Sequence, residues 1–134
     1  MNAHTSSTST AATFARWVVS IHVLVLLVHM FAAITFISGV GAAYLIHAKL
    51  AWVVLGLGIL QALAVLSPAT PRLHRLYVVF AILAVIGEAL QLFLIPRGHL
   101  AYHVSVAMIA WGCTLALYVR LRDPAWGTAT ATAG

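Results

Sequence analysis

Four long apolar stretches limit what this chain can fold into. They span residues 17–37, 45–66, 76–95 and 101–119. Each has about 20 residues, the length at which an α-helix crosses the ~30 Å hydrocarbon core of a bilayer. Only 7% of the residues are charged, whereas 63% are hydrophobic. Because a water-soluble domain of this size carries far more charge, the sequence predicts an all-α membrane protein.

Short turns separate the four apolar stretches. Glycine or proline occurs in each turn, at residues 38–41, 67–71 and 96–98, and both residues interrupt helices. Connections this short make consecutive helices antiparallel neighbours. We therefore predict an up-down-up-down four-helix transmembrane bundle over residues 14–122. In such a bundle the first and third helices are diagonal, and so are the second and fourth.

The two ends of the chain differ in composition from the middle. Residues 1–13 are rich in Ser, Thr and Ala, and residues 123–134 end in a Thr-Ala repeat. Both segments are predicted to be disordered tails. No Lys or Arg precedes residue 14, and the first apolar stretch is longer than the apolar part of a signal peptide. We therefore expect the first span to be retained.

The basic residues are divided unequally between the two ends of the predicted bundle. One end has five and the other has two, namely Arg16, Arg72, Arg75, Arg120 and Arg122 against Lys49 and Arg97. Cytoplasmic loops carry the excess of Lys and Arg, so we expect both termini in the cytoplasm and the protein in the cell inner (cytoplasmic) membrane. Because these residues are scattered singly, the net charge of +5 does not indicate nucleic-acid binding. The expected partner is the lipid bilayer. The single Cys113 excludes an intrachain disulfide.

Histidine is the residue type that most needs explanation in so apolar a chain. Seven histidines accompany only two acidic residues, and at least five of them lie within or beside the apolar stretches. Ionisable side chains are rare inside membranes and usually functional there. Neutral imidazole is also a common ligand of metals, haem iron included. The histidines are therefore the candidate functional residues.

His47 and His103 form the strongest candidate pair. Each lies near the start of its helix at the same end of the bundle, so the two rings are expected at similar depth. Small residues follow both at helical spacing, namely Ala51 and Gly58 after His47, and Ala107 and Ala110 after His103. Such residues leave room for a flat macrocycle, and the pair predicts a haem b site with two histidine ligands. The alternative is that small residues let helices approach and the histidines hydrogen-bond between them.

Three other histidines are weaker candidates for cofactor binding. His99 lies four residues before His103 and is either an alternative ligand or a hydrogen-bonding partner of a haem propionate. His22 and His74 lie on diagonal helices toward the other end, where they would hold a second haem. Their expected depths differ by several ångströms, and His74 also fits a basic cluster at the membrane interface. One haem is expected, and a second is left open.

His29 and Glu88 are expected to meet in the middle of the membrane. Glu88 is the only acidic residue within an apolar stretch. At about 1.5 Å of rise per residue, His29 lies roughly 20 Å from Arg16, and Glu88 lies roughly 20 Å from His74. A contact between them lowers the cost of burying both. It would act as a proton relay, as a contact that fixes helix register, or with Glu88 orienting His29 as an iron ligand.

The second apolar stretch opens with His47-Ala48-Lys49-Leu50-Ala51, and the fourth with His103-Val104-Ser105-Val106-Ala107. In layout, the chain resembles four-span membrane cytochromes b, in which haem lies between antiparallel helices on paired histidines. The two openings also resemble those of a group of short, poorly characterised four-span bacterial membrane proteins. The resemblance covers residues 17–119. It implies haem b held by paired histidines between antiparallel helices, and electron transfer between a quinol and a partner protein.

These observations leave hypotheses of different classes. The first is a membrane cytochrome b, an electron-transfer protein rather than a self-contained enzyme, because two histidine ligands leave the iron no open position. The second is a cofactor-free accessory subunit of a larger membrane complex, or a homo-oligomer, whose histidines hydrogen-bond between helices. A third is a small proton-conducting or transport protein that uses His29 and Glu88.

Overall fold

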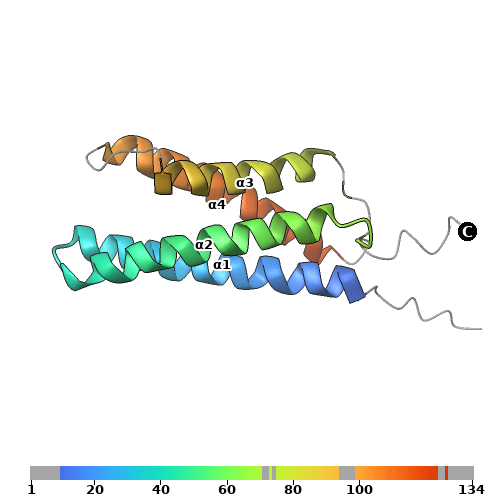
Figure 1. Ribbon diagram of the computed structural model, residues 1–134, viewed down its shortest axis with the longest axis horizontal. Coiled ribbons are helices and arrows are strands. Elements are labelled where there is room, and N and C mark those ends of the chain that lie inside the picture. Colours follow the sequence, from blue (N-terminus) through green and yellow to red (C-terminus); the bar gives the residue numbers. More distant parts are fainter. Residues whose placement is uncertain (1–9, 71–72, 74, 94–98, 124–125, 127–134) are drawn as a thin grey trace, which may run out of the picture.

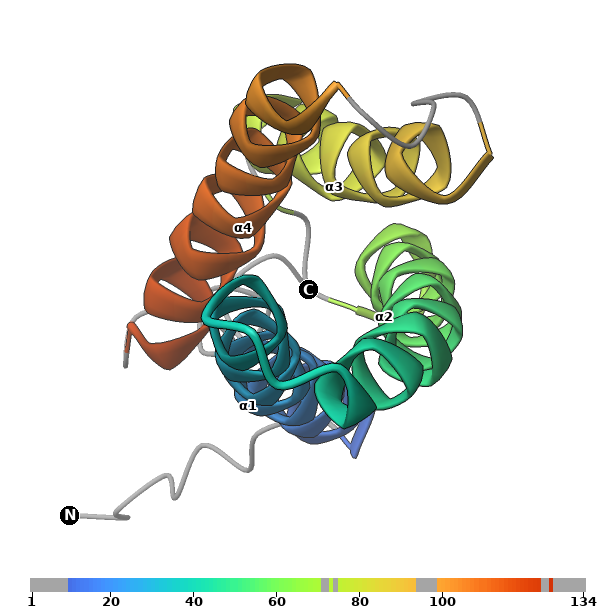
Figure 2. The same cartoon turned by 90° about the vertical axis from the view of Figure 1, so that its left-hand side faces the viewer.

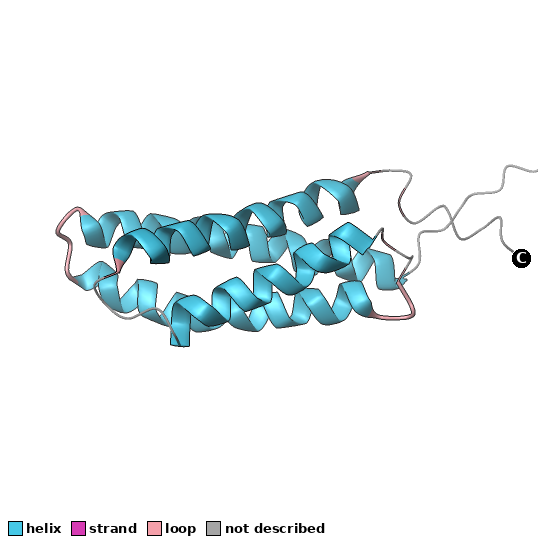
Figure 3. Ribbon diagram, turned by 90° about the horizontal axis from the view of Figure 1, so that it is seen from above, coloured by secondary structure: helices cyan, strands magenta, loops and turns pink. Residues whose placement is uncertain are grey.

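The protein folds into four long α-helices. The computed structural model describes residues 10–70, 73, 75–93, 99–123 and 126. The helices are α1 (Thr10–Ile37), α2 (Ala42–Leu66), α3 (Arg75–Phe93) and α4 (Leu100–Arg122), as Figure 1 shows. All the regular structure in the described residues is helical (Figure 3). Each helix is long and apolar enough to cross a membrane, which confirms the predicted all-α, four-span class.

The helices form a bundle with the predicted neighbour relations. The backbones of each consecutive pair lie close together, as do those of α4 and α1, whereas the backbones of the diagonal pairs, α1 with α3 and α2 with α4, stay apart. The end-on view in Figure 2 shows the four helices around a common centre. The tight turn between α1 and α2 contains Gly39, whose φ of +99° lies in the left-handed region that favours glycine.

Apolar side chains cover the outside of the bundle as well as its inside. Large aliphatic residues on all four helices are strongly exposed, including Leu24, Leu45, Leu63, Leu76 and Val119. A helix that is apolar on every side is either deeply buried or spans a membrane. Since these faces are not covered by protein, they are the faces that contact lipid. The chain is therefore a multi-pass membrane protein.

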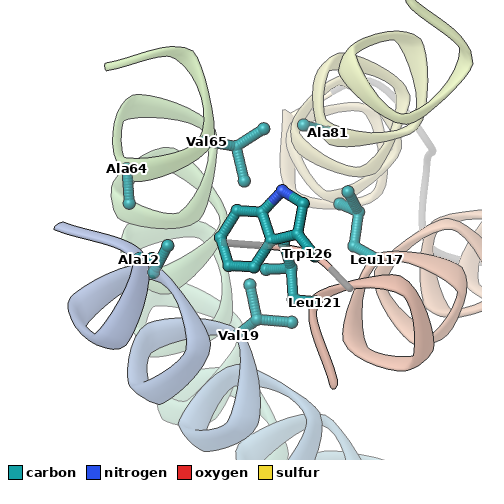
Figure 4. Packing of buried hydrophobic residues seen from close by; sticks show 9 residues of the cluster. Ala12, Val19, Ala64, Val65, Ala81, Leu117, Leu121 and Trp126 are labelled. Carbon is teal, nitrogen blue, oxygen red and sulfur yellow. The ribbon is translucent and has the colours of Figure 1, made fainter. Parts of the chain in front are cut away.

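The bundle is closed most tightly at the end where α1 begins and α4 ends, which we call the terminal end. A buried cluster of apolar residues fills it, and we call this cluster the terminal core (Figure 4). Its members are Ala12, Ala15, Val19, Ala64, Val65, Ala81, Leu117, Leu121 and Trp126. Four alanines let the helices approach closely. The side chain of Trp126, which follows α4, fills the space between them.

The ordered structure reaches further along the chain than the sequence predicted. α1 begins at Thr10, four residues inside the segment 1–13 that was expected to be a disordered tail. Trp126, in the other expected tail, is only 3% exposed. Arg16 links the two segments. Its Nε and Nη2 donate to the carbonyl oxygens of Leu121 and Trp126, both at 2.7 Å, which ties the start of α1 to the end of α4.

The opposite end of the bundle, which carries the turn between α1 and α2, is more open. We call it the far end. No residue of α1 beyond Leu26 and no residue of α3 beyond Glu88 is buried. In Figure 1, α3 and the start of α4 diverge from α1 and α2 toward this end. Most of the described histidines lie in this looser half.

Candidate functional site

Three buried polar side chains from three helices meet inside the bundle. His22 of α1 is 0% exposed. Its Nδ1 lies 3.0 Å from Oε1 of Gln61 on α2, and its Nε2 lies 3.1 Å from Oε1 of Glu88 on α3. Gln61 and Glu88 are also buried. We call these three residues the polar triad.

The contacts of the triad fix the orientation of the imidazole of His22. The amide oxygen of Gln61 only accepts hydrogen bonds, so Nδ1 is the donor in this contact. Nε2 faces the carboxyl group of Glu88 at ion-pair distance. Because both ring nitrogens already have partners, His22 is not free to bind iron in this arrangement. The prediction that His22 and His74 hold a second haem gains no support, and His74 lies outside the described residues.

A glycine of α2 makes room for the carboxyl group of the triad. A Cβ atom built on Gly58 would lie 2.0 Å from Oε2 of Glu88, far closer than atoms approach in real structures. The carboxyl group therefore lies directly against the backbone of α2. The sequence analysis identified Gly58 as a small residue below His47, but its observed role is to accommodate Glu88.

Replacing Gly58 with alanine is expected to disrupt the triad. The new Cβ displaces the carboxyl group from His22 and leaves buried polar atoms unpaired, which costs about 2 kcal/mol or more of unfolding free energy. The matched control is Gly56→Ala, two residues away on the same helix, where a Cβ meets nothing within 4 Å. There the higher helix propensity of alanine should give a neutral or slightly stabilising change of up to about 1 kcal/mol. Unfolding in detergent measures both. Equal effects would contradict this assignment.

The predicted contact between His29 and Glu88 is wrong, because Glu88 pairs with His22. The expected depths were counted from Arg16 as the membrane edge, yet α1 begins six residues earlier, at Thr10. His22 lies twelve residues into α1 and Glu88 thirteen residues into α3. At about 1.5 Å per residue these positions correspond to roughly 18 and 20 Å of rise. The two side chains therefore meet at one level.

A second cluster, toward the far end, brings together His29, His47 and His103 from three helices. The rings of His29 and His47 are stacked, with centroids 4.1 Å apart and planes at 19°. The ring of His103 lies 6.3 Å from that of His47, with planes at 63°. All three are partly buried. The structure thus brings His47 and His103 together across the bundle, as their positions in the sequence predicted.

The orientation of His47 leaves one nitrogen free for a ligand. Its Nδ1 lies 3.4 Å from the main-chain oxygen of His29. A carbonyl oxygen only accepts, so Nδ1 donates and Nε2 carries the lone pair. Histidines that bind metals usually fix their second nitrogen in this way. The stacked ring of His29 covers a face of His47 and leaves its edge accessible.

The spacing of the pair fits two ligands on one iron. Two imidazole nitrogens that bind a metal ion from opposite sides, at roughly 2 Å each, place the ring centroids about 6 Å apart. The observed value is 6.3 Å. The buried residues below the rings are small or medium, as predicted, with Val54 on α2 and Ala110 on α4, but the space at Gly58 is occupied by Glu88. The separation of the two rings is therefore the observation that agrees with two histidine ligands on one iron.

The remaining candidates lie apart from this pair. His99 caps the start of α4, is exposed, and lies near the ring of Tyr102, with centroids 6.0 Å apart. Among the described residues, no three His, Cys, Asp or Glu side chains are arranged to hold a metal ion together. The cluster of three histidines is therefore not a three-donor metal site as it stands.

The partner of Gln61 did not follow from the sequence, because its bond to His22 depends on how the helices tilt. The available signal in the sequence was that Gln61, an amide within an apolar stretch, lies three residues after Gly58 on the same face of the helix. Comparison of the chain with protein-family models, curated proteins and solved structures found no match.

Proposed function

We propose that the protein is an integral-membrane haem b protein that transfers electrons. His47 of α2 and His103 of α4 supply the two ligands. The observation that carries the proposal is the 6.3 Å separation of their rings, together with the hydrogen bond that leaves Nε2 of His47 free. The resemblance of the chain in layout to four-span membrane cytochromes b points in the same direction.

Different residues of the chain would have different roles at such a site. The main-chain oxygen of His29 orients the ring of His47, and the ring of His29 packs against it. A bound haem supplies one-electron chemistry between two oxidation states. Two histidine ligands leave no open position on the iron, which suits electron transfer and not oxygen activation. A quinol as donor and a partner protein as acceptor complete the proposal.

The charge distribution supports one orientation in the cell inner membrane. The described basic side chains Arg16, Arg75, Arg120 and Arg122 lie at the terminal end, whereas Lys49 lies on α2 toward the far end. The excess of basic residues belongs on the cytoplasmic side. Both termini are then cytoplasmic, and the histidine pair lies toward the outer face.

One observation favours the cofactor-free alternative. His22 bonds to two other helices through both of its nitrogens, which is how a histidine that only joins helices behaves. If the other histidines had the same role, the chain would be an accessory subunit of a larger membrane complex. The absorption spectrum of the purified protein separates the two functions.

The test is the reduced-minus-oxidised spectrum with a haem-to-protein ratio. Wild-type protein should show a low-spin b-type spectrum, and His47→Ala or His103→Ala should abolish it, because the iron loses an axial ligand. The matched control is His99→Ala, the same change four residues before His103 at an exposed position. Size-exclusion chromatography in detergent reports whether each variant folds. Wild-type protein purified without haem, or a spectrum that survives in both ligand variants, would refute the site.

A further inference from the structure

We propose that His22, Gln61 and Glu88 form a buried proton-binding site inside the bundle. The site belongs to the polar triad and shares no residue with the histidine pair proposed to hold haem. It therefore adds a function to electron transfer, and it stands whether or not haem is bound. The ligand is a proton, held between an imidazole and a carboxyl group.

The two contacts of His22 indicate how many protons the triad can hold. Nδ1 carries one, donated to Gln61, and the 3.1 Å contact between Nε2 and Oε1 of Glu88 accommodates a second. The second proton moves between these two atoms without changing the net charge, since imidazolium with carboxylate and imidazole with carboxylic acid are both neutral overall. Loss of that proton leaves the carboxylate and a neutral ring. A further proton has an acceptor at Oε2 of Glu88.

Unpaired polar atoms distinguish this triad from a contact that only fixes helix register. Both carboxyl oxygens of Glu88 and Nε2 of Gln61 are buried without a well-aligned hydrogen bond among the described residues, and so is Nε2 of His22, which contacts Oε1 of Glu88 at 3.1 Å as an ion pair. Such atoms cost stability, and a purely structural network is favourable only when all its members are satisfied. A buried carboxyl group held at this distance from an imidazole is instead suited to gaining and losing a proton.

Few other titratable groups face the triad from the surrounding helices. The buried polar side chains of the described residues are the triad, Thr114 and Thr70. Thr70 bonds to the main chain of its own turn. The buried Cys113 is the titratable group that α4 contributes, and α2 contributes only the neutral Gln61. Proton exchange in this part of the bundle therefore belongs to His22 and Glu88.

The packing closes the site toward the terminal end. The terminal core lies directly between the triad and the terminal end, since Val19 is one turn from His22 on α1 and Val65 is one turn from Gln61 on α2. This layer is apolar and closely packed (Figure 4). Beyond the triad, toward the far end, α1 and α3 bury few residues. Protons therefore reach the site from the far end.

The small number of acidic residues makes the test direct. The chain contains two Asp and Glu residues in total, Glu88 and Asp123. In an Asp123→Asn variant, Glu88 is the only side-chain carboxyl group. Infrared difference spectra of this variant in detergent, recorded between pairs of pH values, should show the carbonyl band of a protonated carboxyl group that appears and disappears reversibly. The band should shift in D2O and be absent when Glu88→Gln is added.

The second arm tests whether His22 takes part. Adding His22→Gln to Asp123→Asn should displace the pH dependence of the band by tenfold or more in proton concentration, whereas adding the exposed control His99→Gln should not. A carboxyl band that ignores pH and D2O, or a carboxyl group that never becomes protonated, would overturn the proposal. So would a pH dependence that is unchanged by His22→Gln. Because no haem signal is measured, these outcomes are independent of the electron-transfer proposal.

Discussion

Replacing Glu88 with leucine is expected to lower the free energy of unfolding by about 3 kcal/mol or more, the cost of removing one partner of a buried ion pair. The change strands Nε2 of His22, a side chain that is 0% exposed. His22→Leu should cost a similar amount, because it strands the carboxyl group of Glu88. Glu88→Gln should be milder, since an amide at this position still hydrogen-bonds to the ring.

The double variant His22→Leu with Glu88→Leu should recover part of the combined loss, because no stranded polar group remains. The matched control is His29→Leu with Glu88→Leu. His29 is one heptad along the same helix and does not contact Glu88, so its effect should add to that of Glu88→Leu. Unfolding in detergent gives the four free energies of each cycle. Additivity in the His22 cycle, or coupling in the His29 cycle, would contradict the observed pairing.

The fold follows from the sequence because the bilayer imposes a simple constraint. A segment that crosses hydrocarbon has to satisfy its backbone hydrogen bonds internally, so about 20 apolar residues predict a helix whatever their neighbours are. Short turns then set which helices are adjacent. These two rules predicted the four spans and which helices are diagonal to each other. They also brought His47 and His103 together, since both lie close to the start of a helix at one end.

The register between helices did not follow from the sequence. Depth within a bundle depends on where each helix begins, and α1 begins at Thr10, at the end of the bundle where Arg16 binds the carbonyl oxygen of Trp126. Tertiary contacts of this kind cannot be predicted from the hydropathy of the sequence. The expected position of the partner of Glu88 was therefore wrong by just under two turns of α1. As a result, Glu88 was assigned to His29 instead of His22. Likewise, the space for Glu88 depends on Gly58 facing α3, which hydropathy does not specify.

Trp126→Ala is expected to destabilise the protein by about 3–5 kcal/mol, the cost of truncating a large buried aromatic side chain. Trp126 is 3% exposed and packs among small residues of the terminal core, including Ala12, Ala64 and Ala81. The side chains of these alanines are too short to fill the cavity that the substitution leaves. The loss should also loosen the carbonyl oxygen that Arg16 binds.

Two further substitutions make this prediction specific to the buried ring. Trp17→Ala, at a tryptophan that is 65% exposed on the lipid-facing side of α1, should cost less than about 1 kcal/mol. Trp126→Phe should retain most of the stability, because the buried indole Nε1 has no hydrogen-bond partner among the described residues and the phenyl ring keeps most of the packing. Thermal unfolding in detergent ranks the three variants. If Trp126→Ala were no worse than Trp17→Ala, the segment after α4 would not be part of the core, and the start of α1 at Thr10 would need another explanation.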